Sequence, residues 1–206
     1  QHNRNVIALV NKCIIAALHD IPRIRLGFYN DEHLVHERGH PPGAGHDQEA
    51  RHEPGTVAYS MHLQLQLLQE TTDEMARNGC KKVVIVNGHG GNEHLLPFFA
   101  QSQLEKPHDY VVYVLEPGET PPGGPKAKST GPDWHAGEVE TSAMLVSHPE
   151  LVHQDRSKSE SGADLGRQKL PENVYTGIWW YARFPNHYSG DGSLATREFG
   201  QFRMDA

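Results

Sequence analysis

The sequence predicts an α/β fold with three layers, α/β/α, around a mostly parallel central sheet. Two short apolar runs, at residues 81–86 and 109–116, are continuous, as is typical of parallel strands buried on both faces. Segments with helical spacing alternate with these runs, which predicts a layered α/β domain. With 206 residues the chain is long enough for a substantial core, and we expect residues 1–206 to form a single domain.

The first half of the chain predicts two helices, a long loop and a strand. Residues 6–19 are apolar nearly all round and are interpreted as a buried helix. The polar stretch 27–55 has little periodicity and is expected to be a loop. Residues 56–79 carry apolar side chains at helical spacing, and Gly79 predicts a glycine cap at the helix end. The run 81–86 is the expected central strand.

The second half continues the alternation. Residues 93–105 predict a helix, with Pro97 tolerated near its first turn, and residues 109–116 predict the next buried strand. A connector rich in Pro and Gly follows, and then a helix that ends before Pro149. A short terminal helix is expected near residues 194–200. Neither an internal repeat nor a domain linker is evident in the sequence.

Composition excludes several classes of function. The net charge of −7 and the pI of about 6.1 argue against a nucleic-acid-binding protein and against an anionic membrane surface. No run reaches the roughly 20 apolar residues that cross a bilayer, and no signal peptide is recognised. Cys13 and Cys80 lack metal-type spacing and are expected to be reduced thiols, which favours a cytoplasmic protein. The 15 histidines raise the expectation of a metal site.

The stretch NGHGGN at residues 87–92 places one imidazole among glycines, directly after a predicted strand. It lacks the lysine and hydroxyl of a phosphate loop and the glycine spacing of a dinucleotide site. Ligand sites of open α/β sheets gather at the carboxyl ends of strands, where His89 is expected. We therefore expect the glycines to leave room for His89 to reach a metal or a substrate. The alternative is a glycine turn in which His89 only caps a helix.

The stretch DWHAGEVETSAMLVS at residues 133–147 offers His135, Glu138 and Glu140 ahead of an apolar helix. One imidazole and two carboxylates suit a zinc or manganese site, or a general acid–base pair. Glutamates at a helix N-terminus also stabilise the helix dipole without any catalytic role, and this alternative stays open. The aromatic residues of the last third form either a pocket wall or core: Trp179, Trp180, Tyr181, Phe184 and Tyr188.

Together these stretches resemble the creatininase family of metal-dependent amidohydrolases. The resemblance rests on VVIVNGHGGN, on HAGEVETSAML followed by HPELV, on PGT at residues 54–56, and on HYSGDGSLATREFG. It implies an α/β protein that often assembles as a homohexamer. It also implies two divalent ions, Zn²⁺ or Mn²⁺, which hydrolyse cyclic or linear amide C–N bonds of small molecules.

Carried over residue by residue, the resemblance makes His89 and Glu140 metal ligands. His135 becomes the proton shuttle, with Glu138 as a second acidic catalytic candidate. Trp134 and Trp179 are expected to shape a substrate pocket together with Gly90 and Gly91. Creatinine-hydrolysing members have a tyrosine and a glutamate in place of these two glycines, which argues against creatinine as the substrate.

The N-terminus departs from the family pattern. The first metal motif of the family supplies a glutamate, a histidine and a bridging aspartate, and Gln1-His2 aligns with its Gln-His pair. His2 is then a metal ligand. Asn3 replaces the glycine of the motif, Asn5 its second histidine and Asn11 its bridging aspartate. The domain is thus expected to lack its first strand. Residues of the histidine-rich loop are candidates to compensate: His46, Asp47 and His52.

Three functions follow from these observations. The first is a creatininase-like amidohydrolase that acts through a metal-activated water. The second is a non-catalytic or weakly active metal-binding relative with an incomplete binuclear site. The third is an unrelated α/β module whose glycine loop holds a phosphorylated ligand.

Overall fold

The computed structural model describes residues 6–10, 13–17, 48–54, 56–116, 122–171 and 173–205, the first two ranges as backbone only. The chain divides into two compact units, unit 1 at residues 1–117 and unit 2 at residues 118–206. The α/β class is confirmed, whereas the single domain over residues 1–206 stays a prediction.

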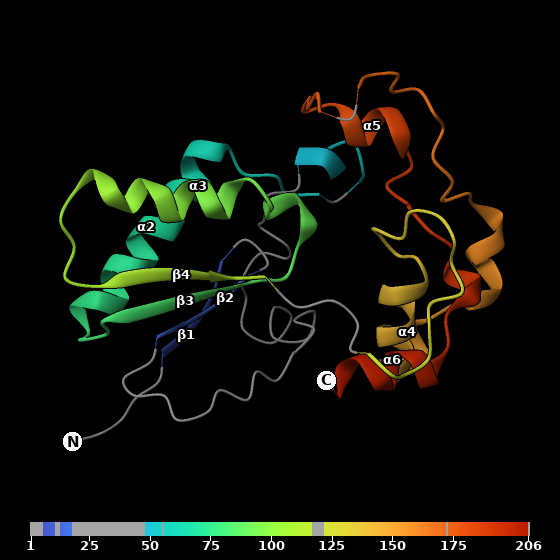
Figure 1. Cartoon of the computed structure of the whole chain (residues 1–206), viewed down its shortest axis with the longest axis horizontal. Helices are drawn as coiled ribbons and strands as arrows, with labels where there is room; N and C mark the ends of the chain where they lie inside the picture. Colours follow the sequence, from blue (N-terminus) through green and yellow to red (C-terminus); the bar gives the residue numbers. More distant parts are fainter. Residues whose placement is uncertain are drawn as a thin grey trace. The chain divides into compact units, whose positions relative to one another are not determined.

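Unit 1 contains a mixed four-stranded sheet in the order β1-β2-β3-β4 (Figure 1). The strands are β1 at Val6–Val10, β2 at Cys13–Ala17, β3 at Lys82–Asn87 and β4 at Val111–Leu115. β1 pairs antiparallel with β2 and β2 antiparallel with β3, and β3 pairs parallel with β4. The predicted strands at β3 and β4 are confirmed. Among the described pairings only β3–β4 is parallel, so the mostly parallel sheet predicted from sequence is not seen in them.

The prediction of a buried helix at residues 6–19 is wrong, because this segment forms β1 and β2. Val10 pairs with Cys13, so the two strands are adjacent both in sequence and in the sheet. An apolar run without a 3.6-residue period does not distinguish a buried helix from buried strands. Two signals favoured strands: the β-branched residues of the run, and the polar pair at 11–12 that divides it into two halves.

Two helices cover one face of this sheet. α2 spans Met61–Arg77 and α3 spans Leu95–Ser102, with 3₁₀ turns at Gln48–Ala50, Gly90–Asn92 and Gln103–Glu105. Both predicted helices are confirmed, and Gly79 has the positive φ of 95° expected of a glycine that follows a helix end. The core residues between helices and sheet are Leu68, Met75, Cys80, Val83, Ile85, Leu95, Leu96, Phe99 and Tyr110.

The face of the sheet that α2 and α3 cover carries Val83 and Ile85 of β3, both fully buried. Their β4 partners, Val112 and Val114, pack against the same core. The alternate residues of β4 are about half exposed among the described residues, at 52% for Val111 and 48% for Tyr113, which differs from the buried strand predicted. Among the described residues, unit 1 therefore has a helical layer on one face of the sheet. The second helical layer of the predicted α/β/α arrangement is not seen in them.

Unit 2 is built from short helices and turns. Its helices are α4 at Glu138–Ser147, α5 at Trp179–Arg183 and α6 at Arg197–Met204, with 3₁₀ turns at Pro149–Leu151, Gln154–Ser159 and Gly192–Leu194. Gly200 allows α4 and α6 to pack closely, because a Cβ at this position would lie only 2.0 Å from the Ser142 carbonyl oxygen. The predicted helices ending before Pro149 and near residues 194–200 are both confirmed. In the described part of the chain, no helix has the length and apolarity needed to span a bilayer.

Candidate functional site

His89 lies just beyond the carboxyl end of β3, as predicted. Its backbone N–H donates to the Asn87 Oδ1 at 3.1 Å, and the Asn92 side-chain amide donates to the same oxygen at 3.3 Å. The Asn87 Nδ2 in turn donates to Glu116 at 2.9 Å, just after β4. One buried asparagine side chain therefore ties the glycine turn to the ends of both parallel strands and fixes the position of His89.

The His89 ring contacts a carboxylate that the sequence did not single out. Its Nε2 lies 2.7 Å from Oε1 of Glu49, and both side chains are mostly buried, with 15% and 17% exposed. Gly91 lies directly beneath this pair. A Cβ at Gly91 would fall 2.4 Å from the His89 Nε2 and 2.5 Å from the Glu49 Oε1. A Cβ at position 91 would therefore displace the end of the His89 or the Glu49 side chain.

Glu49 is held in place through its neighbours. Gln48 donates from its side chain to the Tyr59 carbonyl oxygen at 2.6 Å, and Gln64 of α2 donates to the same oxygen at 2.8 Å. Gln64 is fully buried, so this anchor belongs to the packed body of unit 1. Sequence reasoning assigned residues 27–55 to a loop and proposed His46, Asp47 and His52 as compensating ligands. Of these, His46 and Asp47 lie outside the described residues, and His52 contacts Glu53 at 3.2 Å.

His135 lies in unit 2, at the start of the turn that leads into α4. Its backbone forms an antiparallel bridge with Ser189, through hydrogen bonds of 3.0 and 3.1 Å. Its Nδ1 lies 3.6 Å from Oε2 of Glu140, and that oxygen accepts a 2.7 Å bond from the Ala136 N–H. The structure therefore brings His135 and Glu140 together, with the carboxylate about half exposed.

A second imidazole, His187, packs against His135 and was missed by the sequence reasoning. The two ring centroids are 4.3 Å apart. The indole Nε1–H of Trp180 donates to the His187 Nδ1 at 2.8 Å, so the proton of the neutral His187 ring is on its Nε2. His187 also has a φ of 54°, in a region that non-glycine residues seldom adopt. The only sequence signal was its position inside the HYSGDG motif.

Glu138 is almost completely buried, at 1% exposure, and lies in the first turn of α4. Its Oε2 accepts the backbone N–H groups of Lys128 and Ser129, each at 2.7 Å. These contacts fix the preceding loop on the helix N-terminus, where a carboxylate also favours the helix dipole. The geometry supports an anchoring role, and the catalytic role assigned to Glu138 stays a prediction.

Asp133 supports the same turn. Its Oδ2 accepts the Val139 N–H at 3.1 Å, and its Oδ1 fills the space that a Cβ on Gly137 would occupy. Burial raises the pKa of Asp133 above its ordinary value, and the nearby carboxylates of Glu138 and Glu140 act in the same direction. Three acidic side chains thus converge on the N-terminus of α4.

The two tryptophans predicted to shape a pocket are in contact. The Trp134 and Trp179 rings meet edge to face at 5.6 Å, and the Arg183 guanidinium lies 4.7 Å from the Trp134 ring centroid. Asp164 holds this arginine by a hydrogen bond from its Nε at 2.7 Å, and the arginine lowers the Asp164 pKa. Trp134 is 48% exposed, so the cluster offers an open aromatic surface. Its use as a substrate pocket stays a prediction.

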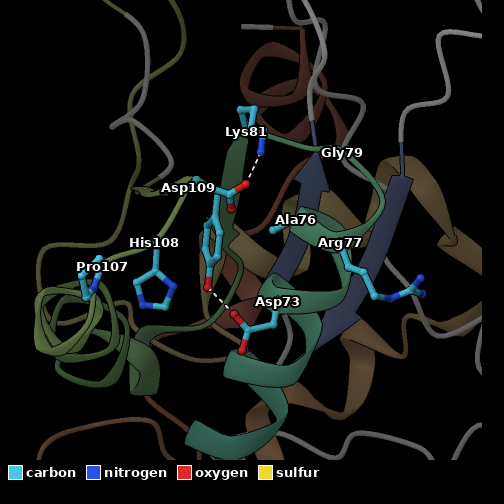
Figure 2. A pocket seen from close by; sticks show the side chains of 9 residues that line it. Asp73, Ala76, Arg77, Gly79, Lys81, Pro107, His108 and Asp109 are labelled. Atoms are coloured by element: carbon cyan, nitrogen blue, oxygen red, sulfur yellow. Dashed lines mark hydrogen bonds and ion pairs between the residues drawn. The ribbon is translucent and has the colours of Figure 1, made fainter.

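A cavity of about 690 Å³ in unit 1 lies away from these residues. Figure 2 shows it between the C-terminal end of α2 and the segments that enter β3 and β4. It is lined by Asp73, Lys81 and Asp109 among others, and burial raises the pKa of Tyr110 beside it. This is the amino end of the parallel strands, whereas ligand sites of such sheets lie at the carboxyl end, where His89 is found. We therefore do not assign it the predicted chemistry.

The structure places the predicted residues in two groups. Unit 1 holds His89 with Gly90 and Gly91, and unit 2 holds His135, Glu138 and Glu140 with the tryptophans. Gly90 borders open space, with nothing within 4 Å of a Cβ built on it. His2, Asn3, Asn5 and Asn11 lie outside the described residues. Among the residues that the structure does describe, no three His, Cys, Asp or Glu side chains form a metal-binding group.

Comparison with known proteins decides the family. The family model described as creatininase, creatinine amidohydrolase, matches residues 40–206. The chain belongs to the creatininase family. This match includes the glycine turn at His89, the turn at His135 and the HYSGDG segment, and it confirms the resemblance inferred from sequence. No curated protein matches the chain.

Solved structures share the fold of this creatininase-family chain. A Bacteroides fragilis protein provisionally named as a creatinine amidohydrolase is 22% identical, with a TM-score of 0.58, over 75% of this chain and 60% of its own. A creatininase in a Mn form is 23% identical over 75% of this chain and 63% of its own, with a TM-score of 0.52. A creatininase variant of Zn–Zn type is 21% identical over 79% and 66%, also with a TM-score of 0.52. The chain thus spans about 60% of the length of the structures it matches.

Proposed function

We propose that this chain is a metal-dependent amidohydrolase that cleaves an amide C–N bond, cyclic or linear, of a small molecule. The observation that carries the proposal is the family match, which contains both the strand-end histidine His89 and the adjacent pair His135 and Glu140. The Mn and Zn–Zn forms among the structural relatives support Zn²⁺ or Mn²⁺ as the ions. Family resemblance supports a homo-oligomer, a hexamer in particular.

The residues present fit a divalent ion. Imidazole and carboxylate are the donors that zinc and manganese accept, and His89 and Glu49 of unit 1 present one of each, 2.7 Å apart. His89 and Glu140, together with His2, are the proposed ligands. A bound divalent ion would lower the pKa of a bound water to about 7 and would polarise the amide carbonyl.

His135 is the proposed proton shuttle. Its ring is about one third exposed, and the carboxylate of Glu140 lies 3.6 Å from its Nδ1. An imidazole can accept a proton from water and deliver it to the leaving nitrogen. His187 packs on its other side and limits the orientations of the ring.

The substrate is proposed to be an amide other than creatinine. Creatinine-hydrolysing relatives have a tyrosine and a glutamate where this chain has Gly90 and Gly91, so the contacts of those side chains are missing here. The edge-to-face tryptophans Trp134 and Trp179 would offer an aromatic surface to a planar amide.

The test is hydrolysis by the full chain loaded with Zn²⁺ or Mn²⁺, assayed on cyclic amides, formamides and creatinine by release of the amine or carboxylate. We expect turnover with His135→Ala to fall by at least about a hundredfold. A matched control is His153→Ala, an exposed histidine of the same unit, which should keep normal turnover. A metal-loaded chain without turnover on any of these amides would instead support the non-catalytic metal-binding relative.

A further inference from the structure

We infer that Glu49 is a metal ligand, and that it supplies the carboxylate that completes the donor pair with His89. This inference rests on the metal-dependent function proposed above, and it assigns a residue that the motifs do not mark. It starts from one contact, the 2.7 Å approach of the Glu49 Oε1 to the His89 Nε2.

The contact has the character of a built site. Both side chains are mostly buried, at 15% and 17% exposure, so an ordinary surface ion pair is a poor description of them. Two donor atoms of the kinds that Zn²⁺ binds, an imidazole nitrogen and a carboxylate oxygen, lie 2.7 Å apart.

The backbone on both sides of the pair is fixed. His89 is held from β3 through Asn87, and Glu49 follows Gln48, whose side chain binds the Tyr59 carbonyl oxygen at 2.6 Å. Two donors positioned before an ion arrives lose less conformational entropy on binding it than mobile ones. The pair is therefore preorganised.

Gly91 adjoins the same pair of side chains. Its missing Cβ leaves the space in which the His89 Nε2 and the Glu49 Oε1 lie, at 2.4 and 2.5 Å from the ideal Cβ position. The adjacent Gly90 has no such neighbour. The second glycine of the turn thus keeps room for this carboxylate, which relates the glycine motif to a residue some 40 positions earlier in the chain.

Binding of Zn²⁺ alone to the metal-stripped full chain tests the inference, measured by isothermal titration calorimetry. Glu49→Gln keeps the shape of the side chain and an oxygen that can accept a hydrogen bond from His89, but it removes the negative charge. We expect this variant to bind Zn²⁺ more than about a hundredfold more weakly, because it loses an anionic ligand. Glu93→Gln, an exposed carboxylate just after the glycine turn, is the matched control and should bind as the wild type does.

The outcomes separate this inference from the proposed function. A loss smaller than about a hundredfold for Glu49→Gln would overturn the ligand role and leave a carboxylate that only orients His89. Circular dichroism of each variant establishes that the fold is kept, and Glu49→Asp, which retains the charge, should recover part of the affinity. A wild-type chain that binds no Zn²⁺ would overturn both proposals, whereas wild-type binding with an unaffected Glu49→Gln would overturn this one alone.

Discussion

His89 in unit 1 and His135 in unit 2 both stand in turns of the creatininase-family chain, but different interactions hold the two turns. The turn at His89 follows β3, whose Val83 and Ile85 are fully buried under α2 and α3. The turn at His135 has no described strand beneath it and is held by side chains that bind backbone groups, as Glu138 binds Lys128 and Ser129. An apolar core supports the first histidine, and buried polar contacts support the second.

The difference shows which part of a site is robust to substitution. Apolar packing is non-directional, so a strand can keep its place while its core residues vary. A carboxylate that accepts two backbone N–H groups is directional, and its loss leaves both donors without that acceptor. Unit 2 contains a further contact of this kind, because the Gln154 side chain donates to the carbonyl oxygens of Gly192 and Ala195 at 3.0 and 2.9 Å.

The largest expected effect is on the apolar core of unit 1. Phe99→Ala removes a ring that is 1% exposed and should lower the free energy of unfolding by about 3–5 kcal/mol. Chemical denaturation measures it. Phe98→Ala, the next residue and 58% exposed, is the control and should cost less than about 1 kcal/mol. Equal losses for the two variants would mean that α3 does not pack on the sheet through Phe99.

Unit 2 should be most sensitive at Glu138. Glu138→Ala removes a buried carboxylate that accepts two hydrogen bonds of 2.7 Å and should cost about 2–3 kcal/mol, also by denaturation. Glu140→Ala, two residues later and exposed, should cost less than about 1 kcal/mol. If both variants were equally mild, the polar anchoring of the His135 turn would be the wrong description.

The two glycines of the NGHGGN turn provide a sharper comparison within unit 1. Gly91→Ala places a Cβ where the ends of the His89 and Glu49 side chains lie, so these must shift, and it should cost about 1 kcal/mol. Gly90→Ala meets nothing within 4 Å and should be neutral or stabilising by up to about 1 kcal/mol. Thermal unfolding of the two variants checks the order. Gly91→Ala should also weaken Zn²⁺ binding if Glu49 is a ligand.

The smallest effect concerns the ion pair beneath the tryptophans. Arg183 holds the Asp164 pKa below its ordinary value, so this pair stabilises the fold above the unfolded-state pKa of about 3.9. The contribution is lost as the pH falls through the lowered pKa. Asp164→Asn should therefore cost less than about 1 kcal/mol at pH 7 and nothing once the pH lies below the lowered pKa. A loss that persisted at low pH would show that packing, not charge, accounts for it.

The sequence by itself determined the elements whose residues repeat with a period. The spacing of apolar residues predicted α2 with its glycine end, because burial of one helix face leaves that pattern in the chain. The continuous apolar runs predicted β3 and β4 as strands, although alternate residues of β4 are about half exposed. The motifs NGHGGN and HAGEVETS predicted the family, since histidines and carboxylates at these spacings can be recognised in the sequence without knowing the surrounding fold. At residues 6–19, where no period was present, the helix prediction was wrong.

Only the tertiary structure decided which side chains meet. Glu49 reaches His89 from a polar stretch without periodicity, and His187 packs on His135 from a loop some 50 residues later. Such contacts depend on how the core and single hydrogen bonds bring distant segments together, so no local sequence pattern predicts them. For the same reason the sequence marked Glu138 only as a candidate catalytic carboxylate, and the structure added that it accepts two backbone N–H groups of the preceding loop.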